Sequence, residues 1–205
     1  MIALSVNRTD RIERAVVALM YAYFTYGVVS NVLATGHVLN LLILVAESLT
    51  LALILLRKPA DAISRNPSDW IFAFCGTLLP LLARPGEAAA IGPVAVGGAL
   101  IALSILAQLA SKLSLGRCFG IVPAKREVVT RGAYRLVRHP IYASYLIAHV
   151  GFCLLNPTPW NIGVYLLALG FQVVRILREE ALLNTSDAYR DYTRLVRHRL
   201  LPGVF

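Results

Sequence analysis

Apolar and polar residues follow one another in long blocks along this 205-residue chain. Apolar runs lie near residues 15–34, 38–56, 70–83, 88–110, 140–155 and 160–177. One membrane crossing needs about 20 helical residues, so the second and fourth runs predict full spans, whereas the third, fifth and sixth are short. The pattern predicts an all-α polytopic bundle of about five to six membrane helices.

The composition also indicates that the bilayer is the solvent of this chain. Hydrophobic residues make up 58% of the sequence, charged residues only 15%, and the mean hydropathy is +0.67. These values are too apolar for a water-soluble domain. The net charge of +9 does not indicate nucleic acid binding, because the basic residues lie between apolar runs, where anionic lipid is the expected partner.

The cysteines do not form a recognisable framework. Cys75, Cys118 and Cys153 lack CxxC spacing, and two of them fall inside apolar stretches. We therefore expect neither a disulfide scaffold nor a zinc site, and no metal is predicted for this chain.

The basic residues predict the orientation in the membrane. Three Lys or Arg residues precede the first run, three lie between the second and third, seven between the fourth and fifth, and six from Arg175 onward. Arg84 alone belongs to the other set of connections. Under the positive-inside rule, both termini and the 111–139 segment are cytoplasmic, as expected for a protein of a bacterial inner membrane.

The connections suggest one integral membrane domain over residues 1–205. Residues 1–110 hold four helices, and residues 111–205 hold a second half built on a helical hairpin. The segment Asn156-Pro157-Thr158-Pro159 is a helix-breaking turn, and Thr35 to His37 is short enough to require a tight turn. The hairpin brings its two polar ends to the cytoplasmic side of the membrane.

Those polar ends are the clusters Arg138-His139-Pro140-Ile141-Tyr142 and Arg175-Ile176-Leu177-Arg178-Glu179-Glu180. Ionisable residues at the ends of membrane helices are costly to keep there and indicate a site. Arg175 and Glu179 are four residues apart, within pairing distance on a helix, and Glu180 lies about 100° around from Glu179. One carboxylate can be held by Arg175 while the other stays free, although a simple polar helix end has the same pattern.

Two further features, one of them a stripe of three residues, have two interpretations each. Tyr142, Tyr145 and His149 share one stripe of the fifth helix. They either line a pocket beneath His139 or serve as interface tyrosines and a core histidine. Glu47, at the middle of the second run, either lines a cavity or forms a hydrogen bond with a polar side chain of a neighbouring helix.

The stretch Gly-Ala-Tyr-Arg-Leu-Val-Arg-His-Pro-Ile-Tyr at 132–142, followed by Arg175 to Glu180, Tyr189, Tyr192 and Pro202, resembles the isoprenylcysteine carboxyl methyltransferase family. The resemblance covers roughly residues 111–205. It implies a membrane bundle that binds S-adenosylmethionine in a cytoplasmic-side pocket and takes a lipophilic substrate from the bilayer. It further implies a cofactor-binding set and a catalytic set: Tyr134, Arg138, His139, Tyr142 and Glu179 for the cofactor, and Arg175 and Glu180 for catalysis.

The resemblance favours carboxyl O-methylation of a prenylated or isoprenoid acceptor. If the acceptor is a carboxylate, Arg175 positions it without a base, whereas an amine or phenol needs a glutamate or His139 as the base. The alternatives are a phospholipid or small-amine N-methyltransferase, an NADPH-dependent enzyme similar to sterol reductases, and a non-enzymatic membrane subunit. Ser144 stands where the family usually has a glycine, two residues after Tyr142.

Overall fold

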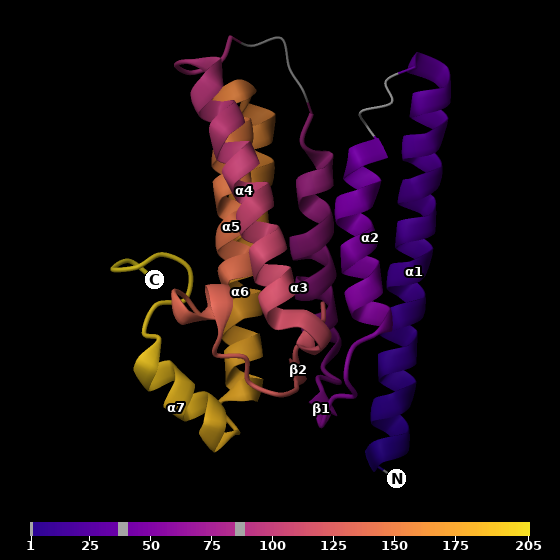
Figure 1. Cartoon of the computed structure of the whole chain (residues 1–205), viewed down its shortest axis with the longest axis vertical. Coiled ribbons are helices and arrows are strands. Elements are labelled where there is room, and N and C mark those ends of the chain that lie inside the picture. Colours follow the sequence, from indigo (N-terminus) through magenta and orange to yellow (C-terminus); the bar gives the residue numbers. More distant parts are fainter. Residues whose placement is uncertain (1, 37–40, 85–88) are drawn as a thin grey trace.

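The computed structural model describes residues 2–36, 41–84 and 89–205, and within them all side chains except those of residues 2–7, 31, 35 and 41–47 (Figure 1). The helices are α1 (Ile2–Thr35), α2 (Leu41–Leu55), α3 (Pro67–Leu78), α4 (Val94–Leu115), α5 (Pro140–Leu155), α6 (Pro159–Leu183) and α7 (Asp187–Leu195). Short 3₁₀ helices cover Leu79–Leu82, Gly116–Cys118 and Gly132–Arg135. The described strands, β1 (Ala62–Ile63) and β2 (Ala124–Lys125), have two residues each.

The prediction of an all-α membrane bundle is confirmed. Among the described residues, three helical segments are long and apolar enough to cross a membrane, namely Arg8–Ala34, Val94–Cys118 and Pro159–Leu183. Pro67–Leu82 and Pro140–Leu155 are shorter apolar helices. Leu19, Tyr23 and Leu33 on α1 are 72%, 81% and 82% exposed, as is normal for side chains that face lipid rather than water. This is an integral membrane protein.

One predicted length differs from the structure. The sixth run was predicted to be short, but α6 has 25 residues, because the helix continues past Arg175 and buries Glu180 in the bundle. The second run was predicted to be a full span, and the structure describes 15 residues of it as α2. Its positions 38–40, and residue 37 of the predicted tight turn, lie outside the described residues.

The carboxy-terminal hairpin has the predicted turn. Helix α5 ends at Leu155 and α6 begins at Pro159, with the Thr158 hydroxyl accepting the backbone N–H of Asn161 at 3.2 Å. Helix α5 also packs against α4, where Gly97 and Gly151 face each other. A Cβ on Gly151 would lie 2.9 Å from the Gly97 carbonyl oxygen, so both positions require a residue without a side chain.

The polar connections gather at one end of the bundle. Figure 1 shows the amino-terminal end of α1, the α2–α3 and α4–α5 connections, and α7 at this end. Here β1 and β2 pair antiparallel, with Ala62 opposite Lys125 and Ile63 opposite Ala124. This pairing ties two connections that are far apart in the sequence, and the pocket described next lies beside it.

Candidate functional site

A pocket at this polar end has a cavity volume of about 170 Å³. Its walls come from α4, the connection after it, α5, α6 and α7. Six of the seven predicted site residues line it, namely Tyr134, Arg138, His139, Tyr142, Arg175 and Glu179. Glu180 lies behind this surface and is not among the lining residues.

Glu180 is instead the centre of a buried polar cluster. The residue is only 4% exposed. Its carboxylate lies 2.8 Å from the Nε atoms of both Arg138 and Arg199, and 3.2 Å from Nε2 of His139. The Tyr189 hydroxyl donates to the same group at 3.4 Å. Four side chains from three parts of the chain are therefore held by one carboxylate.

The tail that follows α7 is docked against the Arg138-His139 pair. The backbone N–H of Arg138 donates to the carbonyl of His198, and that of His139 donates to the carbonyl of Arg199, both at 2.9 Å. Pro140 occupies the first turn of α5, where its missing N–H costs nothing, and His139 sits at the cap position just before it. The tail and the start of α5 thus form one unit with Glu180.

Glu179 points toward the pocket and bonds Tyr142. The Tyr142 hydroxyl donates to the Glu179 carboxylate at 2.9 Å. The Tyr142 ring stacks on His139, with centroids 5.5 Å apart and planes at 9°, and the Arg175 guanidinium lies 4.9 Å from its centre. The spacing in the sequence allowed an Arg175–Glu179 pair, but no ion pair joins them in the described residues, because Arg175 turns toward α3.

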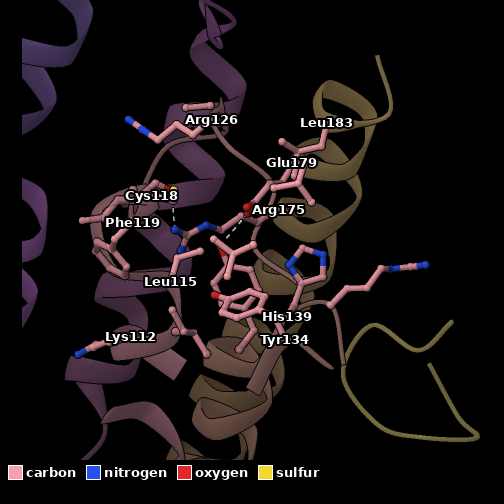
Figure 2. Close-up of a pocket in the computed structure, with 18 of the residues that line it drawn as sticks. Lys112, Leu115, Cys118, Phe119, Arg126, Tyr134, His139, Arg175, Glu179 and Leu183 are labelled. Carbon is pink, nitrogen blue, oxygen red and sulfur yellow. Dashed lines mark hydrogen bonds between the residues drawn. The ribbon is translucent and has the colours of Figure 1, made fainter. Parts of the chain in front are cut away.

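Arg175 spans the space between α6, α3 and the connection after α4. Its Nη1 donates to the Ala73 carbonyl at 3.5 Å and to the Thr77 hydroxyl at 3.3 Å, and its Nη2 donates to the Ile121 carbonyl. Its Nε is buried without a hydrogen-bond partner in the part of the chain that the structure describes. Figure 2 shows this side chain reaching from α6 toward the segment that carries Cys118 and Phe119.

The other positions with open interpretations are resolved in part. Tyr145 lines the pocket, whereas His149 does not and stacks on Tyr165 with ring centroids 4.3 Å apart. The side chain of Glu47 lies outside the described side chains. Among the described residues, no group of three or more His, Cys, Asp or Glu side chains is arranged to hold a metal ion.

Several polar residues at this end were missed by the sequence reasoning. Lys112 is 1% exposed, lines the pocket and donates to the Thr50 hydroxyl at 2.7 Å. Glu13 and Arg57 are buried and paired at 2.9 Å. A usable signal existed for Glu13, since acidic residues are few in this chain and this one adjoins an apolar run.

The aromatic wall of the pocket is electrically neutral. Burial raises the pKa values of the Tyr134 and Tyr189 phenols well above the ordinary range, and that of Tyr192 to about 12. Burial, followed by the neighbouring Arg57, lowers the pKa of Arg126 from its usual value. The phenols therefore act as hydrogen-bond donors, and the charges at the pocket come from Glu127, Glu179 and the basic side chains.

Residues 89–190 match the family model described as phospholipid methyltransferase. The match supports membership of the broader membrane methyltransferase family. It covers about half of the chain, including all seven predicted site residues, and begins just before α4. A search of curated proteins found no match.

Proposed function

We propose that this protein is an S-adenosylmethionine-dependent methyltransferase that acts on a lipophilic substrate within the membrane. The observation that carries the proposal is the pocket itself, in which the Glu179 carboxylate accepts the Tyr142 hydroxyl and the Arg175 guanidinium lies against the ring of the same tyrosine. The family match over the same residues adds the methyl-transfer chemistry.

The donor set fits the cofactor. S-adenosylmethionine carries a sulfonium, an ammonium, a carboxylate and an adenine ring, so its site needs both signs of charge and an apolar wall. Glu179 offers the carboxylate for a cationic group, and the unpartnered Nε of Arg175 offers a donor for an anionic one. Apolar and aromatic side chains such as Phe119 and Tyr134 line the same space and suit a flat ring.

When bound, S-adenosylmethionine supplies an activated methyl group on a positively charged sulfur. The residues of this chain contribute alignment and the exclusion of water, which are the main requirements of an in-line displacement. Tyr142 holds Glu179 in one orientation through its hydroxyl. Glu180 holds Arg138 and His139, so we propose a positioning role for it alongside the catalytic role predicted from the sequence.

Two chemical classes of methyl acceptor are candidates, a carboxylate and an amine. A carboxylate acceptor, as in isoprenylcysteine methyl transfer, suits the basic side chains Lys112, Arg138 and Arg175 at the pocket. An amine acceptor, as in phospholipid methylation, needs a base, for which Glu179 is suitably placed, and the description of the matching family favours such a substrate. We give preference to carboxyl methylation of an isoprenoid acceptor, because several cations line this pocket.

We further propose that the pocket faces the cytoplasm. The polar end carries the amino-terminal end of α1, the basic 111–139 segment and the basic tail (Figure 1). Arg84 lies beside the start of α6, at the other end of that helix from the pocket, where its backbone N–H donates to Asn161 Oδ1 at 2.9 Å. Such an asymmetry orients membrane proteins with the basic end inward, where S-adenosylmethionine is made.

Calorimetric titration of the detergent-purified protein tests the cofactor. We expect binding of S-adenosylhomocysteine and no heat from NADPH. Glu179→Gln should weaken S-adenosylhomocysteine binding by about tenfold, since a charge-assisted contact is lost. The control Asp191→Asn changes an exposed carboxylate of α7 in the same chemical way and should bind like the wild type. Binding of NADPH alone would overturn the proposal, and binding of neither compound would favour a non-enzymatic subunit.

Incubation of the same protein with methyl-labelled cofactor and a membrane lipid extract tests the acceptor. Carboxyl methyl esters release labelled methanol in base, whereas N-methyl groups resist the same treatment. We expect base-labile product, and a base-stable product would move the assignment to N-methylation.

A further inference from the structure

Glu13 of α1 is fully buried and bonded to the pocket wall. One of its carboxylate oxygens accepts the backbone N–H groups of Ile121 and Val122, at 2.8 and 3.1 Å. The other accepts Nη2 of Arg57 at 2.9 Å. Glu13 is 0% exposed, and a carboxylate at that depth is retained only where donors surround it. Both Glu13 and Arg57 lie outside the residues that match the family model.

The segment that Glu13 holds is a wall of the pocket. Phe119, Gly120, Ile121 and Val122 line the cavity, whereas Glu13 does not. The same segment is held from the opposite side by Arg175, whose Nη2 donates to the Ile121 carbonyl. The peptide groups around Ile121 are therefore fixed between α1 and α6.

Glu13 lies in a cluster of neighbouring charges. Asp10, one turn before Glu13, lies 2.7 Å from Arg57 and 3.5 Å from Arg126. Arg126 in turn packs against the wall, since a Cβ on Gly120 would lie 2.6 Å from its Nη1. Asp10 shares the arginines of this cluster but accepts no hydrogen bond from the wall, which makes it a matched control for Glu13.

We infer that Glu13 is a positioning residue for the cofactor pocket, acting from α1 through the Phe119–Val122 wall. This inference rests on the proposed function. A wall held in its binding shape before the cofactor arrives does not have to be ordered on binding, so affinity improves without a direct contact. Loss of the Glu13 carboxylate releases both amides and lowers cofactor affinity, while the acceptor site is left unchanged.

Three variants and two measurements test this inference. Glu13→Ala should weaken S-adenosylhomocysteine binding by about tenfold and raise the KM for S-adenosylmethionine similarly. The KM for the acceptor should change by less than about twofold, as expected when only the cofactor wall is loosened. Glu13→Gln keeps an oxygen that can accept the amides, so its affinity should fall between those of Glu13→Ala and the wild type. Asp10→Asn should retain near wild-type cofactor affinity.

Hydrogen exchange of the Ile121 and Val122 amides reports the contact directly. In the ligand-free wild type both should exchange slowly, and in Glu13→Ala both should exchange faster, while Asp10→Asn leaves them protected. Rapid exchange in the wild type would overturn the inference even if no Glu13 variant folds. Wild-type affinity in Glu13→Ala, or an equal loss in Asp10→Asn, would also overturn it. If the wild type binds no S-adenosylhomocysteine, the proposed function fails, and the exchange data still decide whether Glu13 holds the wall.

Discussion

Replacing Glu180 by glutamine removes a charge that several buried side chains share. The carboxylate lies 2.8 Å from Arg138 Nε, and the two side chains are 6% and 8% exposed. Arg199 lies equally close but is 31% exposed, and His139 is 3.2 Å away. Because Arg138 also borders the pocket, a change at Glu180 affects both stability and the site.

The magnitude follows from the burial of these partners. Removing one member of a buried ion pair costs about 3–5 kcal/mol, because the other charge is left uncompensated. Loss of the pair with the partly exposed Arg199 adds less than about 1 kcal/mol to this cost. Glutamine keeps one carbonyl oxygen as an acceptor, so we place the loss at the lower end, about 3 kcal/mol. For a chain of this length, that corresponds to a fall in thermal midpoint on the order of 10 °C.

Thermal unfolding in detergent, followed alongside methyl transfer, measures this effect. Asp187→Asn is the control, because its carboxylate is 89% exposed and pairs with Arg190 at the surface. We expect the control to unfold within about 1 °C of the wild type. An unchanged midpoint in Glu180→Gln together with lost turnover would refute the positioning argument and favour the catalytic role predicted from the sequence.

Two further substitutions test separate parts of the site. Tyr142→Phe removes the 2.9 Å hydrogen bond to Glu179 but keeps the ring that contacts His139 and Arg175, so S-adenosylhomocysteine affinity should fall by about three- to tenfold in calorimetry. Unchanged affinity would contradict the proposal that the Tyr142 hydroxyl positions Glu179 for cofactor binding. Gly132→Ala should destabilise the protein by about 1–3 kcal/mol in thermal unfolding, since Gly132 has φ +59° and a Cβ would collide with Ser114. The control Gly170→Ala has open space around it and should not destabilise, and equal losses in both variants would contradict the strain argument.

The sequence by itself determined the class of fold and the end of the molecule that carries the site. Three local signals can be recognised without any knowledge of packing. They are the long apolar runs, the prolines at the 156–159 turn and the uneven distribution of Lys and Arg. The resemblance around Arg138 to Tyr142 then located the pocket residues, and six of the seven line the cavity. Helix lengths were less accurate, because the end of α6 depends on buried partners rather than on hydropathy.

Only the tertiary structure decided which partner each charge has. Glu179 and Glu180 are adjacent and about 100° apart around the helix. This rotation places the Glu179 carboxylate at the pocket and buries the Glu180 carboxylate behind the pocket surface. The spacing allowed Arg175 to pair with a glutamate on its own helix, yet it bonds the Ala73 and Ile121 carbonyls far away in the sequence. The Glu13 carboxylate accepts a hydrogen bond from the Ile121 N–H, and these two positions are over a hundred residues apart in the sequence. Such contacts depend on how the helices rotate and pack against one another, and no local pattern in the chain encodes that rotation.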